Sequence, residues 1–172
     1  EKIYLGIGGS STHDLGSGIF VALGGKLLNK KNVEISLGGG ELNKCVRIKI
    51  ESLNNKVNQA QIIIASDVNN PLIGVNGAAK IYSKQKGASK NQIIELEKKS
   101  IYFSRLIKKF NSKDITKIRG GGAAGGTAAG LYGLLNSKIK NGIDILKKIS
   151  NLEKIIKKSS LVITGEGHFD NQ

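Results

Sequence analysis

Hydrophobic residues along this chain fall into short apolar runs, which predict strands, and longer runs with helical spacing. Ile62–Ala65 is typical of a buried strand, and Ile3–Gly8 is a second apolar run that closes on glycines. The clearest helix is Asn91–Phe110, in which apolar residues recur every three or four positions and charges occupy the other face. The remaining predicted elements are a helix at Gly16–Leu23, paired short strands within Lys26–Ile50, a strand at Ile115–Ile118, helices at Thr127–Ile139 and Ile143–Lys158, and a last strand at Leu161–Thr164.

This alternation of strands and helices predicts an α/β fold with flanking helices. The paired strands within Lys26–Ile50 make the expected β-sheet mixed rather than purely parallel. The 172 residues suffice for one sizeable core, so a single domain is expected.

The first candidate site follows the predicted strand Ile62–Ala65. Asp67, Asn69 and Asn70 come directly after it, and Pro71, the only proline, forces an extended turn. Ligands of open α/β sheets bind outside the carboxyl ends of the strands. A carboxylate and two amides at this point therefore indicate a ligand site.

A second polar turn, Gly8–Asp14, follows the first predicted strand and combines glycines with hydroxyls, an imidazole and a carboxylate. Such a turn can hold phosphate oxygens or substrate hydroxyls. The alternative is that Ser or Asp caps the next helix, which accounts for one or two of these residues.

The glycine-rich run Gly120–Gly126 leads straight into a predicted helix. Glycines let the backbone approach a phosphate closely, and a helix N-terminus favours anions. An equally good interpretation is that small residues permit close helix–sheet packing. A dinucleotide-binding site is excluded, because no acidic residue ends a second strand about 20 residues on.

A third strand end carries Glu166, His168 and Asp170 within Gly165–Asp170. Asp67, Glu166 and Asp170 could converge at one edge of the sheet, where carboxylates bind Mg²⁺ with phosphate oxygens or accept a proton from a hydroxyl. The alternative for Asp170 is to cap a following element. Neither a Walker A motif nor a serine-hydrolase elbow is present in the sequence.

The net charge of +14 raises nucleic acid as a partner, but 24 of the 27 basic residues are lysines in scattered pairs, and we do not expect that role. Cys45 is the only cysteine, which fits a reducing cytoplasm. No apolar run approaches the roughly 20 residues of a membrane span, so no membrane partner is expected. The chain begins without Met and ends just after a motif, and we expect it to be part of a longer protein.

Four motifs together resemble the bacterial-type glycerate kinases. They are GIGGSSTHD at Gly6–Asp14, SDVNNPL at Ser66–Leu72 with KQKGA at Lys84–Ala88, GGGAAGG at Gly120–Gly126, and LVITGEGHFD at Leu161–Asp170. The order and spacing match across essentially the whole chain.

The resemblance implies ATP- and Mg²⁺-dependent phosphorylation of D-glycerate, with 2-phosphoglycerate as the expected product. The family has two α/β domains, one inserted into the other. Residues 1–172 are expected to be the inserted α/β domain, incomplete at both ends, with residues 161–172 leading into the second domain. Its partners would be glycerate, a nucleotide and the rest of the kinase chain, without which the segment is expected to be inactive.

The resemblance also assigns residue roles. One of the catalytic carboxylates Asp67 and Asp170 would orient or deprotonate the glycerate hydroxyl, and the other would hold Mg²⁺. The expected substrate- and phosphate-binding residues are Gly8, Gly9, Ser10, Ser11, Asp14, Asn70, Lys86, Gly120, Gly122, Gly125, Gly126, Glu166 and His168.

Some positions depart from the family pattern. This chain has His13 where the family usually has Asn, and Leu15 where it has Gly. It has Arg119 in place of Pro, and His168 in place of Arg. Leu15 is disfavoured if that position needs a positive φ. These changes leave open a diverged substrate or a truncated, non-catalytic binding module of the same fold.

Overall fold

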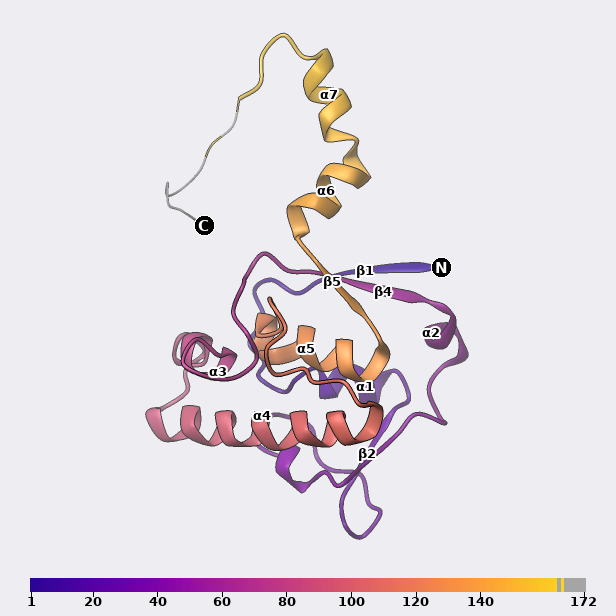
Figure 1. Cartoon of the computed structure of the whole chain (residues 1–172), viewed down its shortest axis with the longest axis vertical. Helices are drawn as coiled ribbons and strands as arrows, with labels where there is room; N and C mark the ends of the chain where they lie inside the picture. The colour runs from indigo at the N-terminus through magenta and orange to yellow at the C-terminus, as the bar shows by residue number, and fades with distance from the viewer. Residues whose placement is uncertain (164, 166–172) are drawn as a thin grey trace.

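The computed structural model describes residues 1–163 and residue 165 (Figure 1). The strands are β1 (Lys2–Gly6), β2 (Lys26–Leu28), β3 (Arg47–Lys49), β4 (Gln61–Ala65) and β5 (Lys138–Lys140). The α-helices are α1 (Ser17–Ala22), α2 (Asn55–Gln59), α3 (Ala78–Tyr82), α4 (Lys90–Asn111), α5 (Ala123–Leu135), α6 (Gly142–Ser150) and α7 (Leu152–Lys158). Two short 3₁₀ helices are η1 (Leu42–Lys44) and η2 (Lys84–Lys86).

A three-stranded parallel sheet in the order β1-β4-β5 positions the candidate site. Leu5 lies opposite Ile64 of the central strand, whose other neighbour is Ile139. Ile64 packs with Ala128 and Leu131 of α5 in one hydrophobic cluster. Because all three strands run the same way, their carboxyl ends lie at one edge of the sheet.

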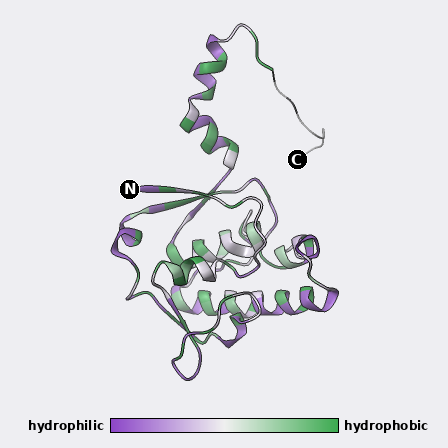
Figure 2. Ribbon diagram, turned by 180° about the vertical axis from the view of Figure 1, so that it is seen from behind, coloured by the Kyte–Doolittle hydropathy of each residue, from purple (hydrophilic) through white to green (hydrophobic). Residues whose placement is uncertain are grey.

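Helix α5 lies between this sheet and α4 (Figure 1). Its opposite face contributes Ala129 and Leu134 to a second cluster, which also holds Phe103 and Ile107 of α4. A helix that is apolar all round is a buried helix, and Figure 2 shows α5 mostly pale or green where α4 alternates purple and green.

Helix α4 is held at both ends by local sequence. Ser89 forms a capping box with Gln92, since each side chain accepts from the other residue's backbone N–H. Ser112 ends the helix in the left-handed conformation, with its N–H donating to Lys108 O. The predicted helix Asn91–Phe110 is confirmed within one residue at each end.

Parallel and antiparallel pairing occur in separate sheets of the described residues. β2 and β3 pair antiparallel as predicted from the Lys26–Ile50 alternation, and they do not join the parallel sheet. The predicted α/β class with flanking helices is confirmed. Instead of one mixed sheet, the described residues form one parallel sheet and one antiparallel sheet.

Four predicted elements differ from the structure. Ile115–Ile118 is a turn rather than a strand, because Asp114 Oδ1 accepts both the backbone N–H and the hydroxyl of Thr116. The predicted helix Thr127–Ile139 corresponds to the regular part of α5, since Ala124, Gly125 and Gly126 before it have left-handed dihedral angles. It stops at Leu135, earlier than predicted, and Lys138–Lys140 forms β5.

The predicted helix Ile143–Lys158 is two helices, because Asn151 adopts the left-handed conformation between α6 and α7. Leu161–Ile163 lie outside any strand, and Thr164 lies outside the described residues. Among the described residues, no helix is long and apolar enough to cross a membrane.

The loop between β1 and α1 is packed directly on the backbone of α5. Leu15 is fully buried at φ 54°, so the position does need the positive φ that disfavours leucine. A Cβ on Gly130 of α5 would lie 1.6 Å from Leu15 O, and one on Gly126, at φ 85°, would lie 2.9 Å from Leu15 Cγ. Only glycine allows this approach.

We predict that Gly130→Ala unfolds or strongly destabilises the chain. Helix propensity alone would favour alanine by about 1 kcal/mol, whereas the 1.6 Å approach to Leu15 O predicts a loss of about 3 kcal/mol, the upper end of the usual cost of overpacking. Urea denaturation followed by circular dichroism measures the difference. Gly40→Ala is the control, since no atom lies within 4 Å of its added Cβ, and it should change stability by less than about 0.5 kcal/mol. A neutral Gly130→Ala would contradict the packing.

Candidate active site

A cavity of about 300 Å³ opens at the carboxyl edge of the parallel sheet, between the end of β4, the β1–α1 loop, η2 and the start of α5. Its lining residues are Ile7, Gly8, Gly9, Ser10, Ala65, Ser66, Asp67, Val68, Tyr82, Gln85, Lys86, Ala123 and Ala124. The predicted residues Gly8, Gly9, Ser10, Asp67 and Lys86 are therefore brought together from three separate segments of the chain.

Lys86 joins η2 to the β1–α1 loop. Its Nζ donates to Thr12 O at 2.8 Å and to Ser10 Oγ at 3.3 Å. Partial burial lowers the pKa of Lys86. The ammonium is thus fixed at the wall of the cavity instead of moving freely in solvent, which is the arrangement that a compact phosphate-binding charge requires.

His13 lies behind this lysine. Ser100 Oγ donates its hydrogen to Leu96 O at 2.7 Å, so His13 Nε2–H is the donor in the 3.0 Å bond to Ser100 Oγ. Nδ1 is then a buried acceptor, without a hydrogen-bond partner among the described residues. Burial and the nearby Lys86 ammonium lower the pKa of His13 to about 4, with Asp14 acting in the opposite direction.

Asp67 follows β4 and is exposed at the cavity. Its Oδ1 accepts the backbone N–H of Gly142 at 2.8 Å, which connects it to the first residue of α6. A Cβ at position 142 would lie 2.7 Å from Asp67 Oδ2, so a side chain there would displace the carboxylate. This single bond leaves the other lone pairs of Asp67 available to a hydroxyl or a metal.

The side chain of Asn70 forms hydrogen bonds within its own loop and to α3. Tyr82 Oη donates to Asn70 Oδ1 at 2.5 Å, and Asn70 Nδ2 donates to Asn76 O at 3.0 Å. Burial raises the pKa of Tyr82, which keeps this donor protonated. Asn70 therefore holds the loop against α3, and only one N–H of its amide remains for a ligand. Next to it, Arg119 Nε donates to Asn69 Oδ1 at 2.8 Å.

Asp14 is the residue that the helix-capping alternative explains best. Its carboxylate accepts the backbone N–H groups of Gly16 and Gly18 and the Ser17 hydroxyl at the start of α1. It does not line the cavity, and neither does the exposed Ser11. Their predicted ligand contacts remain predictions.

The glycine-rich run serves close packing in this structure. A Cβ on Gly122 would lie 2.5 Å from Pro71 O, and one on Gly125 would lie 2.2 Å from Thr12 O. Gly120, at φ 74°, approaches Val68 O. These distances support the packing interpretation of the run, while its predicted contact with phosphate remains a prediction. Ala123 and Ala124 line the cavity, whereas Gly120, Gly122, Gly125 and Gly126 do not.

Tyr82 and Ala124 also line the cavity, although no sequence pattern selects them. Ala124 adopts φ 52° in the kinked first turn of α5, which its sequence does not reveal. Glu166, His168 and Asp170 lie outside the described residues, so their predicted convergence with Asp67 remains a prediction.

Comparison with known proteins gives the chain its family. The model of the glycerate kinase family matches residues 1–172. This chain belongs to the glycerate kinase family. It is 44% identical to glycerate 2-kinase of Escherichia coli K12 over 171 residues, which are 99% of this chain and 45% of that protein. It is 40% identical to glycerate kinase of Halalkalibacterium halodurans over 172 residues, which are all of this chain and 45% of that protein.

A solved relative has the same fold as this glycerate kinase family member. The crystal structure of a protein designated glycerate kinase 2 from Salmonella typhimurium LT2 matches 99% of this chain with a TM-score of 0.89 and 38% identity. The match covers 46% of that chain. The present chain thus spans less than half the length of the relatives it matches.

We predict that His13 makes stability depend on pH. The unfolded imidazole titrates near 6.5 and the folded one near 4, so the unfolded state binds the extra proton and stability falls as pH falls through this window. Between pH 7.5 and pH 5 the loss should be about 2 kcal/mol, measured by urea denaturation. His13→Gln, which cannot titrate, should remove this part of the pH dependence. An unchanged slope in His13→Gln would show that the ring is solvated.

Proposed function

We propose that this chain is part of an ATP- and Mg²⁺-dependent kinase that phosphorylates D-glycerate to 2-phosphoglycerate. The observation that carries the proposal is the cavity at the carboxyl edge of the sheet, where Ser10, Asp67 and Lys86 from three separate segments line one space. Similarity to a protein named glycerate 2-kinase supports the choice of the 2-hydroxyl.

The cavity suits anionic substrates. Glycerate carries a carboxylate and ATP carries phosphates, and Lys86 offers a fixed ammonium to either. Gly8 and Gly9 leave backbone N–H groups accessible without side chains in the way. Asp67 would orient the glycerate hydroxyl or accept its proton. Phosphoryl transfer depends mainly on positioning and charge neutralisation, so these groups are of the required kind.

Mg²⁺ fits this site only in combination with substrate. Among residues 1–163 and 165, no three acidic, histidine or cysteine side chains form a metal cluster. Mg²⁺ is commonly held by one or two carboxylates together with phosphate oxygens, and Asp67 is the carboxylate at the cavity. Asp170 would be the second carboxylate. When bound, the ion would neutralise negative charge on the phosphates.

We predict that a chain of the relatives' full length carrying residues 1–172 releases ADP from ATP and Mg²⁺ only when D-glycerate is present. Separating the phosphoglycerate isomers identifies the phosphorylated hydroxyl. Asp67→Asn should lower kcat at least about tenfold, because the amide cannot accept the proton. Binding of substrate without ADP release by the unmodified chain would favour the non-catalytic binding module.

The matched control for this variant is Asp144→Asn, which removes an exposed carboxylate two residues after Gly142 and should leave kcat unchanged. Titration with Mg²⁺ separates the two roles of Asp67. A general base gives a lower kcat at the same Mg²⁺ requirement, whereas a metal ligand gives a higher Mg²⁺ requirement. If Asp67→Asn retains full kcat and Mg²⁺ affinity, Asp67 has neither role.

We further predict that Lys86→Gln raises the KM for ATP or for glycerate by about tenfold or more, because a charge-assisted hydrogen bond to the anion is lost. Steady-state kinetics with each substrate varied in turn shows which anion Lys86 binds. Lys84→Gln removes an exposed lysine from the same 3₁₀ helix and is the control for net charge. Equal effects of the two variants would mean that only long-range attraction is involved.

A further inference from the structure

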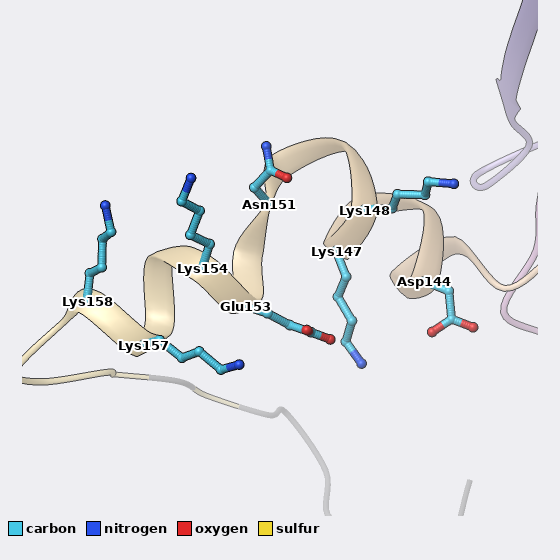
Figure 3. Close-up of a pocket in the computed structure, with 8 residues that line it drawn as sticks. All are labelled: Asp144, Lys147, Lys148, Asn151, Glu153, Lys154, Lys157 and Lys158. Carbon is cyan, nitrogen blue, oxygen red and sulfur yellow. The ribbon is translucent and has the colours of Figure 1, made fainter.

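A charged hollow along α6 and α7 has the composition of an anion site without the burial of one. Figure 3 shows its side chains spread apart, and they are those of Asp144, Lys147, Lys148, Asn151, Glu153, Lys154, Lys157 and Lys158. Neither helix contains a buried residue, so water already solvates these charges. A better indication of a ligand is a buried polar group without a hydrogen-bond partner, because such a group lowers stability until something pairs with it.

Three serine hydroxyls are buried without a hydrogen-bond partner in the part of the chain that the structure describes: those of Ser66, Ser83 and Ser137. Ser83 and Ser137 are enclosed, with 2% and 1% of their surface exposed, and neither lines the cavity at the carboxyl edge of the sheet. Ser66 is half-buried and does line that cavity. Of these three hydroxyls, it is therefore the one at the candidate active site.

The backbone of Ser66 is fixed, while its hydroxyl remains available for a hydrogen bond. Ser66 follows the last residue of β4, and its backbone N–H donates to Lys140 O at 2.9 Å, which extends the pairing of β4 with β5. A Cβ added to Gly120 would lie 3.4 Å from Ser66 Oγ, so the glycine keeps this side of the hydroxyl clear. Rotation about the Cα–Cβ bond moves Oγ between staggered positions without moving the strand.

We propose that Ser66 is a substrate-binding residue whose hydroxyl donates a hydrogen bond to an anionic oxygen of the ligand in this cavity. That oxygen belongs to the carboxylate of glycerate or to a phosphate of ATP, so the inference rests on the proposed function. Lys86 supplies charge to the same cavity, Asp67 supplies acceptor oxygens, and Ser66 adds a neutral donor. Because Ser66 directly precedes Asp67, a ligand that contacts both is oriented by two adjacent groups.

Ser66→Ala, in a chain of the relatives' full length carrying residues 1–172, separates a ligand contact from a structural role. We expect the KM for D-glycerate or for ATP to rise about tenfold, as for loss of a hydrogen bond to a charged group, with kcat changed by less than about twofold. The KM that rises identifies the bound anion. The Tm of the ligand-free protein should be unchanged or higher, because a buried hydroxyl without a partner is removed. Ser66→Cys keeps a weaker donor and should raise the same KM by less.

The matched control is Ser137→Ala, which removes a buried, unpartnered hydroxyl that does not line the cavity and should leave both KM values unchanged. If Ser66→Ala also leaves both KM values unchanged, the proposal is wrong. A rise in KM accompanied by a lower Tm of the ligand-free protein would overturn it as well, because the hydroxyl would then act by stabilising the fold.

A binding measurement distinguishes failure of this proposal from failure of the proposed function. The increase in Tm on addition of ATP with Mg²⁺, or of D-glycerate, reports binding without turnover. If the unmodified chain binds either ligand but releases no ADP, the kinase function fails, while a smaller Tm increase in Ser66→Ala still supports the role of Ser66. If the unmodified chain phosphorylates D-glycerate and Ser66→Ala behaves identically, only the role of Ser66 fails. If the unmodified chain binds neither ligand, both fail.

Discussion

The rest of the structure depends on the direct contact between the β1–α1 loop and the glycine face of α5. Gly125 and Gly130 bring the backbone of α5 against the backbone at Thr12 and Leu15, with no space for a single methyl group. This contact sets where the loop crosses the end of the sheet, and hence where Ser10 lies. It also requires an unfavourable φ at Leu15, which the surrounding packing must stabilise.

The candidate site results from this constraint and from the parallel sheet together. The sheet brings the ends of β1 and β4 to one edge, and the packed loop and Lys86 close the cavity from the side. Ser10 and Lys86, which share a hydrogen bond at this cavity, are 76 residues apart in the sequence. A cavity of this kind is stable only as long as the loop remains on α5, so stability and ligand binding share the same glycines.

Much of this arrangement could be predicted from the sequence. The strand before Asp67, the helix Asn91–Phe110 and the polar turn after β1 follow from periodicity and turn residues, and the order of the motifs indicated the family. Other features could not be predicted locally. Lys138–Lys140 becomes a strand only because β4 offers an edge to pair with, and Ile115–Ile118 loses its strand character to a side-chain hydrogen bond from Thr116 to Asp114. The role of Asn70 depends on Tyr82, twelve residues later, which no pattern connects to it.

The bond from Gly142 to Asp67 connects the candidate site with the first residue of α6 at one atom pair. A ligand that competes for Asp67 Oδ1 therefore also acts on the start of this helix. By thermodynamic linkage, ligand binding at the cavity and formation of the first turn of α6 are coupled, and each changes the free energy of the other by the same amount.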